Sequence, residues 1–242
     1  RYSQWGGNVF NESQEDISQG QDSGLAYSWN FKLRPYEMVH KRVAFAIRDT
    51  SYYVSSASGA DTDSTDGTYS HPFKTIEYAL ERIGNKKGYV YVMDYPDISA
   101  SISLTGSNQD ITITSTNFDT SGTTVSGIQT LQRASSYGGG MFHVTGGAIL
   151  RLTDIILDGG GIQSPDSLVN ASGGRLEINS GATIQNCHGN PESMGSAVNI
   201  TGSASLSMNF GKVSENKSEG KGAVYFDCSG TFEVIHDVSV ED

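Results

Sequence analysis

Four short segments decide the fold of this chain: FHVTG at 142–146, VNASG at 169–173, VNITG at 198–202 and VYFDC at 224–228. They begin at residues 142, 169, 198 and 224, which gives intervals of 27, 29 and 26 residues. Each is followed by a second short apolar alternation and then by a polar corner, as in Leu150-Arg151-Leu152 and Leu157-Asp158-Gly159. Repeats of roughly 20–50 residues indicate a solenoid, a propeller or an array of small units.

Within each repeat the runs alternate apolar and polar residues, a period of two that is typical of β-strands. No run between them is long enough for a helix, and glycine or asparagine stands at the bends. Short strands separated by tight corners, with each coil stacked on the next, predict an all-β fold, a parallel β-helix with three-sided coils.

Stacked coils predict vertical columns of matching residues about 4.8 Å apart. Three inward columns are entirely apolar: Phe142, Val169, Val198 and Val224; Leu150, Leu176, Leu206 and Phe232; and Leu152, Ile178, Met208 and Val234. The outward position between the last two columns reads Arg151, Glu177, Ser207 and Glu233. This order puts opposite charges on neighbouring coils, which such ladders tolerate better than like charges.

The two cysteines, Cys187 and Cys228, fall on different corners of this alignment. A disulfide needs Cα atoms within about 7 Å, so we expect no bond between them. Asn186 and Asn216 each follow the last strand of a repeat, and we expect them to form a corner ladder.

The chain of 242 residues divides into two parts by pattern. Residues 1–50 alternate like a β-hairpin, which is marginal alone, so we expect them to end an upstream β-sandwich or to pack on the solenoid. Residues 51–242 hold the β-helix, with an amphipathic helix at about 73–83 that caps its apolar core. The Ser-, Thr- and Gly-rich stretch at about 117–140 predicts an irregular loop.

Two stretches before the repeats carry a family resemblance. The segment YYVSSASGADTDSTDGTYSHPFKTIEYALERI at 52–83, followed by GYVYVMD at 88–94, resembles the entry segment of right-handed parallel β-helices in the pectate-lyase-like superfamily. The repeats resemble coils of bacterial surface β-helices, and DSGLAYSW at 22–29 resembles the closing strands of a β-sandwich in Gram-positive cell-surface proteins. The resemblance implies a fold rather than an activity, because the superfamily includes lyases, hydrolases, adhesins and phage tailspikes.

Charge and hydropathy exclude several classes of partner. The formal net charge of −11 argues against nucleic acid, which needs a basic face, and against docking on anionic membranes or polysaccharides. No run of about 18 apolar residues predicts membrane insertion. The chain begins without an initiator methionine and ends in mid-pattern, so we expect a monomeric fragment of a longer protein.

One outward row supplies the candidate ligand-binding residues. His143, Asn170, Asn199 and Tyr225 occupy the same position in successive coils, between two inward residues. This row is polar and partly aromatic, so it can hydrogen-bond and stack on sugar rings. Tyr137, near the end of the 117–140 loop, is added because loops on rigid scaffolds often carry binding.

Two acidic groups offer alternative chemistry. Asp154 and Asp158 flank a strand near a glycine corner, and paired carboxylates can act as acid and base in glycoside hydrolysis. The other reading makes them corner residues that bind backbone N–H groups. Asp61, Asp63 and Asp66 stand close together beside Gly67, where an oxygen-rich loop can hold calcium, or where aspartates simply stabilise a turn.

These observations favour a non-catalytic module for binding, adhesion or spacing, with a glycan or a host or bacterial surface protein as its partner. We expect it to be secreted and to lie at the cell surface or cell wall of a Gram-positive bacterium. No cofactor is expected apart from the calcium alternative. The competing hypothesis is a polysaccharide lyase or glycoside hydrolase on the same fold, acting through Asp154 and Asp158.

Overall fold

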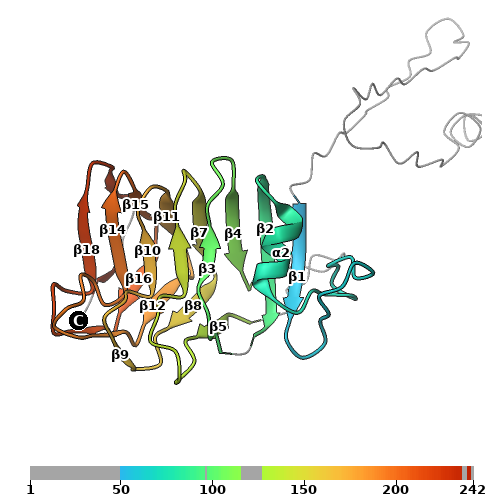
Figure 1. Ribbon diagram of the computed structural model, residues 1–242, viewed down its shortest axis with the longest axis horizontal. Coiled ribbons are helices and arrows are strands. Elements are labelled where there is room, and N and C mark those ends of the chain that lie inside the picture. Colours follow the sequence, from blue (N-terminus) through green and yellow to red (C-terminus); the bar gives the residue numbers. More distant parts are fainter. Residues whose placement is uncertain (1–49, 96, 116–126, 236–238, 241–242) are drawn as a thin grey trace, which may run out of the picture. The chain divides into compact units, whose positions relative to one another are not determined.

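The computed structural model describes residues 50–95, 97–115, 127–235 and 239–240. These residues form a parallel β-solenoid of about 5 turns with one short helix near its N-terminal side (Figure 1). The predicted β-hairpin and β-sandwich remnant at 1–50 lies almost entirely outside the described residues. No helix in the described ranges is long and apolar enough to cross a bilayer.

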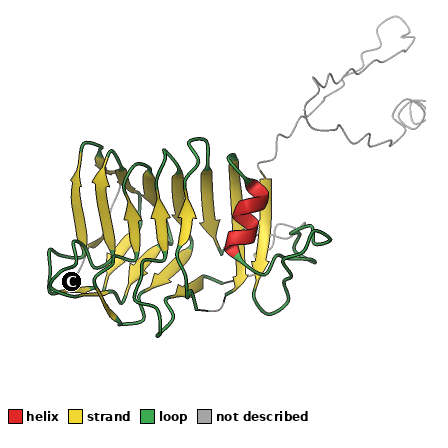
Figure 2. Cartoon of the chain, in the orientation of Figure 1, coloured by secondary structure: helices red, strands yellow, loops and turns green. Residues whose placement is uncertain are grey.

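The strands stack into four sheets, and every pair of neighbouring strands is parallel (Figure 2). The first sheet contains β1 (Thr50–Ser55), β2 (Lys87–Asp94), β4 (Asp110–Thr114), β7 (Ile149–Thr153), β11 (Arg175–Ile178), β15 (Ser205–Met208) and β19 (Phe232–Val234). The second contains β3 (Ile102–Leu104), β6 (Phe142–Val144), β10 (Val169–Ala171), β14 (Val198–Gly202) and β18 (Val224–Cys228).

The other two sheets close each coil. The third sheet contains β5 (Gln129–Gln132), β8 (Ile155–Asp158), β12 (Thr183–Gln185), β16 (Lys212–Ser214) and β20 (Ser239–Val240). The fourth contains only two-residue strands: β9 (Gln163–Ser164), β13 (His188–Gly189) and β17 (Lys217–Ser218). The coils after β8 are therefore four-sided, whereas the sequence pattern predicted three sides.

The predicted register is confirmed residue by residue. Leu150, Leu176, Leu206 and Phe232 pair in one file, and Leu152, Ile178, Met208 and Val234 in the next. Phe142, Val169, Val198 and Val224 form the third column, in the second sheet. All members are buried apart from those of the last coil, where Val224 is half-buried and Phe232 is 49% exposed. These columns form the dry centre that holds the coils together.

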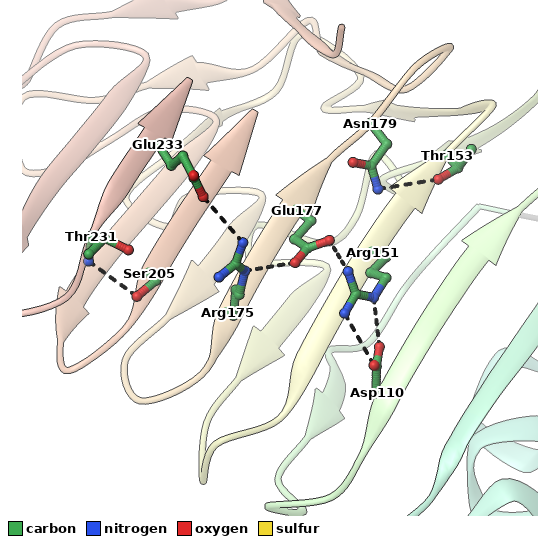
Figure 3. Close-up of polar contacts among 9 residues, drawn as sticks. All are labelled: Asp110, Arg151, Thr153, Arg175, Glu177, Asn179, Ser205, Thr231 and Glu233. Carbon is green, nitrogen blue, oxygen red and sulfur yellow. Dashed lines mark hydrogen bonds and ion pairs between the residues drawn. The ribbon is translucent and has the colours of Figure 1, made fainter. Parts of the chain in front are cut away.

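Figure 3 shows the outward charges on the first sheet. Arg151 donates from Nε and Nη2 to the two oxygens of Asp110, at 2.8 and 3.2 Å, and from Nη1 to Glu177. Glu177 also pairs with Arg175 at 2.7 Å, and Arg175 with Glu233 at 3.6 Å. The predicted opposite-charge pair, Arg151 beside Glu177, is therefore confirmed, and Asp110 and Arg175 of the adjacent column extend it into a network.

Helix α2 (Ile76–Ile83) begins three residues later than the sequence predicted. Thr75 is extended and acts as the N-cap, since its side chain accepts a hydrogen bond from Tyr78 N at 3.2 Å. The predicted apolar face, Ile76, Ala79, Leu80 and Ile83, is buried in the solenoid core. Gly84, with φ of 66°, ends the helix through its N–H bond to Leu80 O.

Strand β5 corrects the prediction for 117–140. Gln129–Gln132 pairs in parallel with Ile155–Asp158 of β8, so this part of the stretch is a coil strand and not an irregular loop. Residues 116–126 lie outside the described residues. The strand was missed because only one of its four residues, Leu131, is buried and apolar.

The expected Asn186–Asn216 ladder is wrong by one residue. Asn186 N donates to Glu215 O, whereas Asn216 lies beside Cys187 inside the corner. Asn216 is fully buried; its Oδ1 accepts from Cys187 N at 3.0 Å and its Nδ2 donates to Ile184 O at 3.1 Å. Cys187 and Cys228 are free, as expected, and burial raises the pKa of Cys187 to about 12.

Asp94 joins the end of β2 to the turn after β1. Its carboxylate accepts from Ser55 Oγ at 2.7 Å, Ser56 Oγ at 2.8 Å and Ala57 N at 3.1 Å. Burial alone would raise the pKa of Asp94, but these hydrogen bonds outweigh it and hold the pKa below the ordinary value of 3.8.

A carboxyl group whose pKa is lowered by folding stabilises the folded state when it is charged. This contribution is complete above the unfolded-state pKa of about 3.9 and is lost as pH falls through the folded-state pKa. We therefore expect Asp94→Asn to lower the melting temperature at about pH 6 and to have a smaller effect at about pH 2. Thermal unfolding followed by circular dichroism at both pH values measures this, and an equal loss at both would contradict it.

Candidate functional site

The candidate binding residues lie in one continuous row on the outer face of the second sheet. Parallel pairing places Ser103, His143, Asn170, Asn199 and Tyr225 at equivalent positions of β3, β6, β10, β14 and β18. We call these five residues the polar row. Four of them were predicted; Ser103 was missed because the longer interval between β3 and β6 interrupts the repeat.

The middle of the polar row is fixed by amide hydrogen bonds. Asn199 Nδ2 donates to Asn170 Oδ1 at 3.2 Å, and Asn170 Nδ2 donates to Ser167 O at 3.0 Å. Asn199 Oδ1 is enclosed and has no hydrogen-bond partner within the described part of the chain. His143 and Ser103 are exposed, and the two asparagines are half-buried. The row therefore combines rigid amides with accessible groups that both donate and accept.

The last coil adds an aromatic and charged end. Tyr225 OH donates to Asp227 Oδ2 at 3.1 Å, and Lys221 Nζ lies 5.1 Å from the centroid of the Tyr225 ring. This is within the distance of a cation–π contact. The hydroxyl group of Tyr225 is thus bound to a carboxylate and its ring face lies near an ammonium group, while the side chain stays half-exposed.

Tyr137 lies on a turn that approaches the polar row. Its hydroxyl donates to Gly140 O at 3.0 Å, and burial raises its pKa, so it remains a donor at neutral pH. A Cβ atom at Gly140 would lie 2.7 Å from Asn170 Nδ2 and 3.2 Å from His143 Nε2. The glycine is therefore required where this turn packs against the row, and the turn borders one side of it.

The two candidate catalytic aspartates lie at the two ends of β8. Asp158 is 9% exposed; its Oδ1 accepts from Gly160 N at 2.7 Å and its Oδ2 from Gln185 and Asn186 at 2.9 and 2.7 Å. Asp154 directly precedes β8 and has a left-handed backbone conformation, with φ of 47°. Its carbonyl oxygen accepts hydrogen bonds from the N–H and Oγ of Ser115. Asp158 thus uses its carboxylate to fix a bend, as in the alternative reading of this pair.

The three aspartates of the acidic turn point to different partners. Asp61 caps the approach to α2, accepting from Lys74 N at 2.7 Å and from Thr75 N and Oγ1 at 3.2 and 2.7 Å. Asp63 faces Arg82 at 3.5 Å, and Asp66 accepts from Thr68. Among the described residues no group of three or more His, Cys, Asp or Glu side chains could hold a metal ion. The calcium alternative stays a prediction, which a calcium titration would test.

One cavity was not predicted. A space of about 320 Å³ lies between α2 and β3, bordered by Glu77, Glu81, Asn85, Ser103, Thr105 and Gln109. Its walls come from a helix and a strand that are separated in sequence by β2, so no local motif could indicate it. Ser103 belongs to both the cavity and the polar row.

The fold and this surface define the chain as a parallel β-solenoid with a polar row on one sheet. No protein-family model, curated protein or solved structure matches it.

Proposed function

We propose that the chain is a non-catalytic binding module that presents the polar row to a glycan, as part of an extracellular protein at a Gram-positive cell surface. The observation that carries the proposal is the continuity of the row over five coils, with a hydrogen bond between the side-chain amides of Asn199 and Asn170 at its centre. The resemblance of 52–94 to pectate-lyase-like β-helices supports the assignment to that superfamily.

The spacing of the row suits a linear polymer. Neighbouring rungs are about 4.8 Å apart, close to the length of one sugar unit in an extended chain. Each rung can therefore address one sugar, with amides and hydroxyls meeting sugar hydroxyls and the Tyr225 ring meeting an apolar sugar face. A row of half-buried and exposed polar groups binds through many modest contacts, each hydrogen bond contributing about 0.5–1.5 kcal/mol.

The test is a glycan array followed by calorimetry on the tightest-binding oligosaccharide. We expect Tyr225→Ala and His143→Ala each to weaken binding about tenfold, which corresponds to about 1.4 kcal/mol. The control is Thr183→Ala, a half-buried outward position on the third sheet, which should bind as the parent does.

Two results would contradict this function. One is the absence of binding to every glycan on the array. The other is release of reducing sugar from a polysaccharide, abolished by Asp154→Ala or Asp158→Ala, which would establish the competing hydrolase or lyase hypothesis.

A further inference from the structure

The cavity between α2 and β3 lies at the N-terminal end of the polar row. Figure 1 shows α2 next to the edge of the second sheet that β3 forms. β3 pairs with β6 on one side only, and the cavity borders its other side. Because Ser103 is the first rung of the row and also lines the cavity, the two features form one surface.

The wall on β3 offers unused hydrogen-bonding groups. Ile102 N donates to Met141 O and Leu104 O accepts from Thr145 N, both toward β6. Since peptide groups alternate in a parallel ladder, the N–H and C=O groups of Ser103 face the cavity. This wall therefore presents a short open strand edge to an occupant.

Gln109 adds a donor to the same wall. It is 9% exposed, and its Oε1 accepts from Thr105 N at 3.1 Å and Gly106 N at 3.4 Å. Its Nε2 has no hydrogen-bond partner among the residues that the structure describes. This amide nitrogen is not one of the enclosed unpartnered atoms, so it is accessible at the cavity and can donate to a hydroxyl or carbonyl oxygen of an occupant.

The helix wall carries negative charge. Glu77 and Glu81 are exposed and stand one turn apart on α2. Tyr95 OH donates to Glu77 Oε2 at 3.2 Å and accepts from Ile76 N at 3.3 Å, which orients this carboxylate. Burial raises the pKa of Tyr95, so the hydroxyl remains a donor. No lysine, arginine or histidine lines the cavity.

The apolar contact at the floor of the cavity comes from Leu80, which is 5% exposed, because Ile102 in the same lining is fully buried. An apolar floor with carboxylate acceptors on one side and an amide donor on the other suits a ring with one apolar face and several hydroxyls. The two glutamates would repel a carboxylate on that ring. The volume of about 320 Å³ is near the lower end for small-molecule sites and holds one or two sugar units.

We infer that this cavity is the terminal subsite of the polar row: it takes the end unit of a linear, uncharged glycan, and Glu77 and Glu81 exclude a uronic acid. The inference rests on the proposed function. From Ser103 to Tyr225 the row spans four steps, about 19 Å at the inter-strand spacing, so a chain of five units fills the row with its end in the cavity.

The test uses linear pentasaccharides of β-1,4-linked glucose, mannose, xylose and N-acetylglucosamine, and of α-1,4-linked galacturonate, by calorimetry at low salt. We expect at least one neutral chain to bind and galacturonate to bind at least tenfold more weakly. Ser103→Phe fills the cavity from an exposed position and should weaken the neutral chain about tenfold. Thr130→Phe, exposed on β5 of the third sheet, is the matched control and should change nothing.

The double variant Glu77→Gln and Glu81→Gln keeps the shape of the wall and removes its charge. It should bind the neutral chain within about twofold of the parent and raise the affinity for galacturonate at least fivefold. If Tyr225→Ala weakens binding while Ser103→Phe does not, and the glutamine variant leaves the affinity for galacturonate unchanged, the cavity inference fails and the proposed function stands. Equal binding of galacturonate and neutral chains by the parent overturns the inference, as does binding of none of the five, whereas binding of no glycan on the array overturns both.

Discussion

Leu176→Ala is expected to lower the free energy of unfolding by about 3–5 kcal/mol. Leu176 is fully buried, with Leu150 on the coil before it and Leu206 on the coil after it. Truncation removes the contacts with both neighbouring leucines and leaves a cavity that the rigid stack of coils cannot close. Urea denaturation followed by circular dichroism gives the change in stability.

Phe232→Ala is the control in the same column. Phe232 pairs with Leu206 but is 49% exposed at the last described coil, so its truncation removes only part of the contact area. We expect a loss of about 1 kcal/mol or less. Equal losses at Leu176 and Phe232 would contradict the view that burial between two coils sets the cost.

A central substitution should also affect cooperativity. In a solenoid each coil contacts only its neighbours, so stability is nearly a sum of coil and interface terms. Weakening the coil of Leu176 separates the coils before it from those after it. We therefore expect the unfolding transition of Leu176→Ala to be broader than that of Phe232→Ala, in addition to its lower midpoint.

The columns could be predicted because the physical constraint repeats. Leu150, Leu176 and Leu206 meet the same requirement, an apolar side chain between two inward neighbours, and the corners recur at nearly constant intervals. The polar row followed from the same alignment, because the position between two inward residues must point outward. One correct register therefore placed most of the candidate binding residues.

Elements without a repeated apolar signal were missed. β9, β13 and β17 have two residues each and contain glutamine, serine, histidine, glycine and lysine, which read as corner residues. Their pairing depends on backbone groups that the tight corners bring together. The cavity beside α2 likewise depends on how a helix and a strand edge meet, which no periodicity encodes.

Arg133 is a buried charged residue whose position the sequence pattern does not predict. It is 1% exposed, and its guanidinium donates to Gly159 O at 3.2 Å and to Ile162 O at 2.8 Å. Arginine is rarely buried in this way, so a sequence reading places it in solvent. The carbonyl groups of the next glycine-rich corner make its burial tolerable, and burial lowers its pKa.

Arg151→Met is expected to lower the free energy of unfolding by about 2–3 kcal/mol. Methionine keeps the apolar stem but removes the guanidinium that holds Asp110 and Glu177, whose side chains are 22% and 12% exposed (Figure 3). Breaking a buried ion pair costs about 3–5 kcal/mol, and the partial exposure of these groups reduces that figure. Arg175 remains beside Glu177, so most of the lost stability comes from Asp110, which no longer has Arg151 as its partner.

Two further variants separate the causes of this loss. Arg82→Met removes an arginine whose partner, Asp63, is 97% exposed at 3.5 Å, and we expect no measurable change because water screens that pair. Arg151→Lys keeps the charge, but a single ammonium cannot hold both oxygens of Asp110 and reach Glu177 at once. Its stability should therefore fall between the parent and Arg151→Met, and a lysine variant as stable as the parent would show that charge alone, not the forked geometry, links these coils.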